Sequence, residues 1–430
     1  MPRMTPAEKD RNVAGLGQPE ASGRLEALSR LAAAGTPARP AEEEVNNHIH
    51  TFYSFSPYSP AEAVWRSVQA GLTTAGIMDH DSISGAEEFN AAGRIAGLAT
   101  TTGLECRCRF GGTPLEGRRL NNPDQLSVAY VALHGLPRDR ITEVRGWFRP
   151  LQAERNRRNR LMVGRLNDLL ALPELALDFE RDVLPLSRHE EDGTVTERHI
   201  LFALSLRLLQ VAGRGPGLLD FLEQKLRLRP SGRVRALLED PSNPHYPYDL
   251  LGAFKSGLVE SFYVEAAGEC PDVRELLSFA WQVGAISAYA YLGDITDSVT
   301  GDKKSQSFED GYLEELFQVI TGLGFQAVTY MPNRNTPEQL ARVQALCARH
   351  GLFQISGVDI NSPRQSFTCP ELRLPQYRHL VQATWALIGH ELESTQDPSR
   401  GLFSPQTVRR YPRLEERVAA YAVLGRRRGA

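Results

Sequence analysis

The sequence lacks the cysteine spacing and the long apolar runs that would place it in several common classes of protein. It holds five cysteines in 430 residues, an odd number, and none form a Cys-x-x-Cys pair. This usage argues against a disulfide framework and indicates a reducing compartment. No apolar run approaches the roughly 18 residues of a membrane span, and the N-terminus has no apolar signal-peptide core. We therefore expect a cytoplasmic protein without a membrane partner.

A strong net charge is also missing. The formal net charge is −3, so no global basic field favours nucleic acid or an anionic membrane. One basic stretch, residues 225–235, would suit a nucleotide or nucleic acid, but no aromatic residues alternate with its basic ones. A small molecule is the expected partner, and the oligomeric state is left open.

The bulk composition is that of an ordinary globular protein, with 41% hydrophobic and 23% charged residues. The length allows two to three domains or one large barrel with insertions. We expect an N-terminal extension with a short helix over 1–44. A main body would comprise 45–140 and 281–430, and a helical insertion over 141–280 would cap it.

The periodicity of apolar residues predicts seven strands, the first three of which interleave with helices in β-α-β-α-β order. This order favours parallel strands joined by right-handed crossovers. The expected strands are 45–50, 72–78, 98–109, 126–134, 284–292, 325–331 and 352–359. The expected helices are 22–34, 59–71, 84–96, 147–170, 197–209, 218–228, 233–238, 311–323, 336–350 and 376–391. Residues 1–22 are polar and rich in Gly and Pro, which predicts disorder at the start.

Two histidine motifs indicate a metal site. His48 and His50 are two apart in an expected strand, so both side chains project from one face. About thirty residues later, another apolar run ends in Asp79, His80 and Asp81. Neutral imidazole and carboxylate ligands suit divalent ions such as Zn, Mn and Fe.

Further polar residues stand at the ends of expected strands, namely Glu105, His134 and Asp359. In a (β/α) barrel the C-terminal ends of the strands carry the active site. Taken singly, His134 would more often be a hydrogen-bonded structural residue, and Glu105 would pair with a neighbouring arginine. Their recurrence at strand ends favours a shared rim.

In this order, the motifs resemble the polymerase and histidinol phosphatase (PHP) family, and within it the bacterial metal-dependent phosphoesterase branch. The resemblance covers about residues 45–140, 195–210 and 280–365. It rests on H-x-H (His48, His50), D-H-D (Asp79, His80, Asp81), G-L-E (Glu105), a strand-terminal histidine (His134), E-R-H-I (His199) and G-V-D-x-N (Asp359, Asn361).

The resemblance implies a distorted, TIM-like (β/α)7 barrel with divalent ions at its C-terminal rim. It implies that His48, His50, Glu105 and Asp359 ligate one ion, and that Glu105 bridges to a second ion completed by His134 and His199. His80 would belong to a further position, and Asp79 is counted among the ligands. One to three ions (Zn, Mn or Fe) are expected, with two favoured.

The same resemblance suggests catalytic and substrate-binding roles. Asp81 or His80 would assist proton transfer, and Arg198, or an arginine from 155–160, would clamp a phosphate because guanidinium pairs with it in a bidentate way. For the run 155–160 a solvated helix face is the more ordinary interpretation. Tyr289 would donate hydrogen bonds to a ligand or pack in the core, and Asn361 would contact substrate.

Three positions depart from the family pattern. Phe55 stands where the branch usually has an aspartate ligand, Tyr289 where it has a histidine, and Asn361 where it has the last histidine. These changes predict that one metal position is weakened or absent.

The favoured function is hydrolysis of a phosphate ester, either a small phosphomonoester or a nucleotide, with metal-bound hydroxide as the nucleophile. Two alternatives remain. One is hydrolysis of a non-phosphate ester or amide by the same site. The other is a catalytically decayed, metal-binding scaffold.

Overall fold

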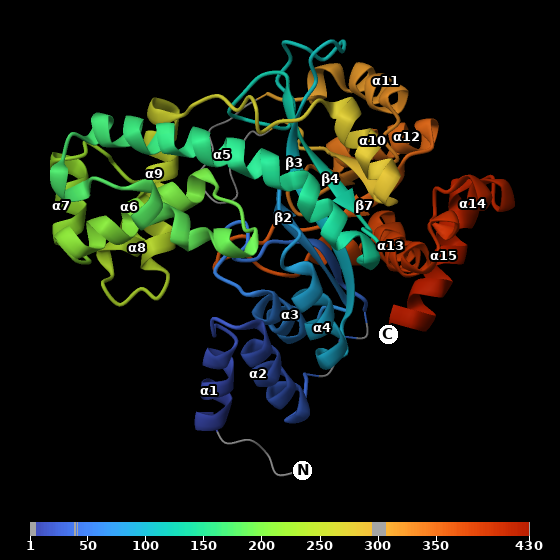
Figure 1. The fold of residues 1–430 in the computed structure, drawn as a ribbon, viewed down its shortest axis with the longest axis horizontal. Helices are drawn as coiled ribbons and strands as arrows, with labels where there is room; N and C mark the ends of the chain where they lie inside the picture. The colour runs from blue at the N-terminus through green and yellow to red at the C-terminus, as the bar shows by residue number, and fades with distance from the viewer. Residues whose placement is uncertain (1–5, 38–39, 41, 295–306, 430) are drawn as a thin grey trace.

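The computed structural model describes residues 6–37, 40, 42–294 and 307–429. A seven-stranded sheet lies at its centre, with the strands in chain order (Figure 1). The α/β class and the seven strands predicted from the sequence are confirmed. The strands are β1 (Val45–Ile49), β2 (Thr74–His80), β3 (Ala99–Arg109), β4 (Val128–His134), β5 (Ile286–Ala290), β6 (Ala327–Tyr330) and β7 (Phe353–Ser356).

The strand directions differ from the all-parallel expectation at one strand. β4 runs antiparallel to both β3 and β5, whereas the other neighbouring pairs are parallel. Residues 110–127, between β3 and β4, contain no helix, whereas the crossover of a parallel pair is usually an α-helix. This connection instead reverses the chain.

The curled sheet is not closed by a continuous ladder. Between its two ends, the described residues show one isolated parallel bridge, which joins Ile49 to Ile360 just beyond β7. This bridge nevertheless brings the segment after β7 alongside the end of β1. The amide of His50 donates to the Ile360 carbonyl at 3.0 Å, and that of Ile360 donates to the His48 carbonyl at 3.0 Å.

Helices cover the outer face of the sheet and bury one large apolar core with it. They are α3 (Pro60–Gln69), α4 (Ala86–Ala96), α10 (Val273–Val283), α11 (Leu313–Leu323), α12 (Pro337–His350) and α13 (Arg378–Gln396). Two C-terminal helices that the sequence did not predict follow, α14 (Pro405–Arg410) and α15 (Leu414–Gly429). α15 crosses α13 where Gly389 and Gly425 meet, because a Cβ at either position would lie within 2.2 Å of a carbonyl oxygen of the other helix.

The N-terminal region is more ordered than expected. α1 (Pro6–Gly15) is helical where disorder was predicted, so that prediction is wrong for residues 6–15, and residues 1–5 lie outside the described part. α2 (Ala21–Ala33) confirms the predicted helix. Arg24 on α2 is fully buried and forms a bidentate ion pair with Glu88 on α4, which fastens this region to the main body.

The segment between β4 and α10 forms a second apolar cluster of its own. Its helices are α5 (Ile141–Leu170), α6 (Glu197–Ala212), α7 (Pro216–Gln224), α8 (Gly232–Glu239) and α9 (Tyr246–Phe262), and in Figure 1 α6 to α9 project to the left of the sheet. α5 bridges the two clusters, since Phe148 packs in the first and Leu166 in the second. No described helix combines the length and apolar character needed to cross a membrane.

Candidate metal centre

The H-x-H, D-H-D and G-L-E motifs converge at one end of the sheet. His48 lies in β1 and His50 directly follows it, His80 ends β2, and Glu105 lies in the middle of β3. His80 pairs with Glu105 in the parallel register of β2 and β3, so their side chains share one face. Asp359 reaches the same place from the segment after β7, beside the Ile49–Ile360 bridge.

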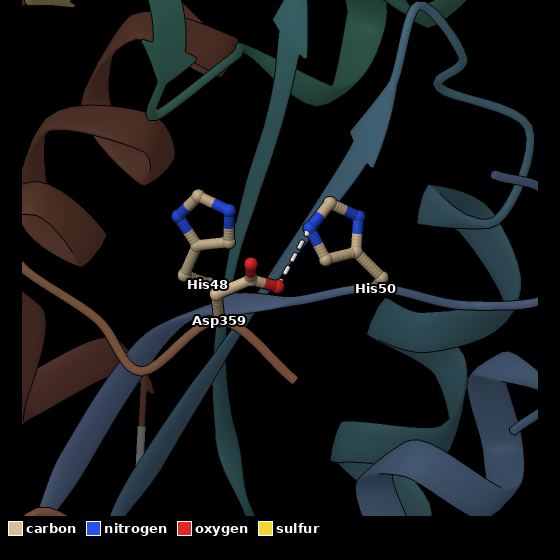
Figure 2. Close-up of side chains that lie close together, drawn as sticks. All are labelled: His48, His50 and Asp359. Carbon is tan, nitrogen blue, oxygen red and sulfur yellow. Dashed lines mark ion pairs between the residues drawn. The ribbon is translucent and has the colours of Figure 1, made fainter. Parts of the chain in front are cut away.

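One carboxylate oxygen stands at the centre of this group. Glu105 Oε1 lies 3.0 Å from His80 Nδ1 and 3.4 Å from the Nε2 atoms of both His48 and His50. Asp359 Oδ1 lies 3.2 Å from His50 Nε2 (Figure 2). The ligand atoms form two overlapping trios, each within 4.8 Å: His48, His50 and Asp359, and His50, His80 and Glu105.

The electrostatics keep both carboxylates ionised. Burial by itself raises the pKa of Glu105, but His80 and His48 outweigh it and bring that pKa to about 2. Burial likewise raises the pKa of Asp359, and His50 outweighs it, so the pKa falls well below its usual value. Burial lowers the pKa of His80 to about 3, against the Glu105 carboxylate, which raises it.

These atoms fit a divalent cation. His50 Nε2 is buried without a hydrogen bond of acceptable geometry, although two carboxylate oxygens face it. Imidazole nitrogens and carboxylate oxygens that converge in this way form a ligand set able to hold a divalent cation between them. The centre is also accessible, since the side chain of Asp359 is 40% exposed and that of His80 is 22% exposed.

Asp79, an expected ligand, lies outside both trios. It alternates with His80 along β2 and therefore points away from the face that carries Glu105. Its carboxylate accepts hydrogen bonds from the Thr51 amide (2.7 Å), the Thr51 hydroxyl (2.6 Å) and the Ser54 hydroxyl (2.6 Å). In this structure Asp79 holds the turn after β1.

Asp81, expected to assist proton transfer, is engaged in a buried ion pair. Its Oδ2 lies 2.7 Å from Arg155 Nη2, on α5. Burial raises the pKa of Asp81 to about 6, against the lowering effect of Arg155. The Gln152 side chain donates to the Asp81 carbonyl at 2.8 Å, so α5 holds this residue twice.

The arginines of 155–160 are likewise occupied. Arg155 and Arg158 are buried and pair with Glu269, while Arg157 and Arg160 are exposed and pair with Glu154 and Glu180. All four guanidinium groups thus have carboxylate partners, so the expectation of a free phosphate clamp in this run is not met.

His134 lies beside the centre without joining either trio. It ends β4 and shares its face with Glu105, because Glu105 pairs with Ala132 and side chains alternate. Burial lowers its pKa to about 3, and its Nε2 is buried without a hydrogen bond. Because β4 is antiparallel, the C-terminal end of this strand lies on a level with Met78 of β2, below His80.

His199 occupies a capping position, outside both trios. It is the third residue of α6, and its Nδ1 accepts the Thr196 amide at 2.9 Å in a capping box. Burial lowers its pKa to about 3, so the ring is neutral and carries its proton on Nε2. The Thr196 amide thus uses the Nδ1 lone pair, and the role of His199 in a second ion site stays a prediction.

The three residues expected to bind substrate fall into different environments. Arg198 is half-buried, its positive charge lowers the pKa of Asp359, and the described residues offer it no hydrogen bond or ion pair. Tyr289 is fully buried, donates to Glu309 at 2.9 Å and packs against Phe110, so it belongs to the core. Asn361 donates to Asp359 Oδ1 at 2.6 Å and thus orients that carboxylate.

Sequence reasoning missed Tyr130 on β4. Its ring centroid lies 5.6 Å from that of His80, and it pairs with Arg107 on the face that carries Glu105. The signal was the alternation of β4 itself, because Tyr130 and His134 are four residues apart and share a face. Arg107, beside Tyr130, is buried and pairs with Glu269 and Glu197.

Comparison with known proteins adds a shared fold. A metal-dependent phosphoesterase, so named provisionally, from Bifidobacterium adolescentis is similar with a TM-score of 0.51 and 19% identity, over 80% of this chain and 98% of that one. An amidohydrolase from Chromobacterium violaceum, with bound sulfate and no metal, gives a TM-score of 0.49 and 16% identity, over 79% and 96%. No family model and no curated protein matches the chain.

Proposed function

We propose that this chain is a metal-dependent hydrolase of phosphate esters, of the PHP type. The observation that carries the proposal is the position of Glu105 Oε1, within 3.4 Å of nitrogen atoms of His48, His50 and His80. Carboxylates beside imidazoles form a ligand set that suits Zn, Mn and Fe. The fold shared with a proposed metal-dependent phosphoesterase is consistent with this assignment.

Two divalent ions would suit the two trios. His48, His50 and Asp359 would hold one ion, and Glu105 and His80 would hold the other next to it. A bound divalent ion supplies a hydroxide at neutral pH and neutralises phosphate charge. Asn361 keeps Asp359 in place through its amide, and the exposed edges of Asp359 and His80 leave room for a substrate.

Arg198 favours an anionic substrate over an uncharged one. Its guanidinium is available beside Asp359, and α6 begins at the preceding residue, Glu197. A guanidinium binds phosphate through two parallel hydrogen bonds, and the first N–H groups of a helix also favour an anion. A small phosphomonoester or a nucleotide is therefore the proposed substrate class.

The test measures phosphate release from a panel of phosphomonoesters and nucleotides by protein reloaded with Mn²⁺ or Zn²⁺, together with metal content. Glu105→Gln removes the central charge with little change in shape, and we expect it to lose both metal and phosphate release. His379→Ala, a half-buried histidine that bonds to Gln354, is the control and should retain both.

The outcomes separate the candidate functions. Release from the wild type that disappears in Glu105→Gln would support the phosphoesterase. Turnover of uncharged esters or amides without phosphate release would favour the other hydrolase. Folded wild-type protein that binds no divalent ion would overturn the metal centre.

A further inference from the structure

The turn that follows β1 contains a chain of hydrogen bonds leading from a carboxylate to a candidate ligand. Ser54 Oγ donates to Asp79 Oδ1 at 2.6 Å, and His50 Nδ1 lies 3.2 Å from the same Ser54 oxygen. All three side chains are fully buried. No water or other donor is needed to complete the chain.

Counting protons along this chain fixes the state of His50. The Thr51 hydroxyl and amide also donate to Asp79, so this carboxylate acts as an acceptor throughout. The single hydroxyl proton of Ser54 is given to Asp79, and its oxygen can therefore only accept from His50. His50 Nδ1 must then carry a ring proton, so Nε2 is the nitrogen that can offer a lone pair to an ion.

That lone pair points to the metal centre. His50 Nε2 lies 3.4 Å from Glu105 Oε1 and 3.2 Å from Asp359 Oδ1, and it is buried without a hydrogen bond. The tautomer set by Ser54 is thus the one able to bind an ion at this place.

The turn is held in place from the side of the helical insertion. Phe55, next to Ser54, belongs to the second apolar cluster and lies edge-on to His199, with ring centroids 5.0 Å apart. It also contacts Phe202 and Tyr248. The backbone of Phe55 has a φ of 121°, a conformation that persists only where the surroundings enforce it.

We propose that Ser54 is a positioning residue of the metal centre, which relays the Asp79 carboxylate to His50 and presents His50 Nε2 to a divalent ion. The inference rests on the proposed metal centre. A hydrogen-bond partner on the far nitrogen of a metal-binding histidine orients the imidazole, sets its tautomer and raises its basicity, and its loss typically weakens metal binding by about 10- to 100-fold.

The matched variants are Ser54→Ala and Ser56→Ala. Both serines lie in the same turn and are buried, but Ser56 only accepts a 3.4 Å hydrogen bond from the Tyr58 amide. We expect Ser54→Ala to bind Zn²⁺ or Mn²⁺ about 10- to 100-fold more weakly in chelator competition, and Ser56→Ala to bind as the wild type does. Thermal unfolding in excess chelator reports any purely structural effect.

A second measurement needs neither a variant nor a metal. In metal-free wild-type protein labelled with ¹⁵N-histidine, the ring nitrogens of His50, assigned by comparison with His50→Gln, should show the proton on Nδ1. A neutral ring with its proton on Nε2 and none on Nδ1 overturns the proposal, as does a folded Ser54→Ala protein with wild-type affinity, even if its stability is reduced. If the wild type binds no metal, the proposed function fails, while the tautomer still decides whether the relay exists.

Discussion

Phe55 provides a sharp test of the strained turn, because its side chain and its backbone have opposite effects on stability. The side chain is 6% exposed and packs among Phe202, His199 and Tyr248, so truncating it leaves a cavity. Phe→Ala changes at buried sites cost about 3–5 kcal/mol of unfolding free energy. We expect Phe55→Ala to lie within this range.

The backbone makes a second, signed prediction. At an ordinary position glycine is less stable than alanine by roughly 0.5–1 kcal/mol. At a φ of 121° the Cβ of alanine is strained, and removing it should recover about 1–2 kcal/mol. Phe55→Gly should therefore be more stable than Phe55→Ala by about 1 kcal/mol.

Phe202→Ala and Phe202→Gly are the matched control variants. Phe202 contacts Phe55, but it lies inside α6, where the backbone is helical and unstrained. There, glycine should be the less stable of the two, by about 1 kcal/mol. Urea unfolding of all four variants in excess chelator, followed by far-ultraviolet circular dichroism, compares the two rankings. If the unfolding free energy of Phe55→Gly is lower than that of Phe55→Ala by the same margin as between the two Phe202 variants, the argument for backbone strain is wrong.

Three further predictions concern the centre and its surroundings. Arg198→Met should lower kcat/KM for a phosphomonoester roughly 10- to 100-fold through loss of a charge-assisted hydrogen bond, with metal content unchanged; equal activity would remove Arg198 from the substrate site. Removing the ions with chelator should lower the Tm, since a ligand at 100 times its Kd stabilises by about 2.7 kcal/mol, and His50→Ala should show a much smaller shift. Burial raises the pKa of Glu309 from 4.5 to about 7, against the Tyr289 hydrogen bond that lowers it, so the folded protein binds the extra proton between these values. Stability should therefore fall by up to about 3 kcal/mol as pH rises from 4.5 to 7, and Glu309→Gln should flatten this dependence in urea unfolding at a series of pH values.

The sequence was most informative where a pattern is local. Alternation along a strand placed His48 and His50 on one face, and the apolar runs predicted all seven strands. It was less informative about several helices, since α1, α9, α10, α14 and α15 were not predicted. α9 is apolar over much of its surface, and α15 ends in arginines and depends on the close approach of Gly389 and Gly425, so neither showed a clear helical period.

Chain order also misled where direction depends on the connection. The predicted rim assumed that every strand points the same way, but β4 turns back, so His134 reaches the interior from the opposite direction. His134 still shares a face with Glu105, because side chains alternate between the two faces of a sheet whichever way the strand runs.

The sequence by itself determined which side chains are able to bind a divalent ion and which of them share a face. Only the tertiary structure decided which remain available. Asp79 and His199 have the same chemistry as the residues of the centre, but Thr51 and Ser54 occupy the first, and the Thr196 amide occupies the second. A buried polar atom takes the partner that the fold brings within reach, and that partner can lie far away in the sequence.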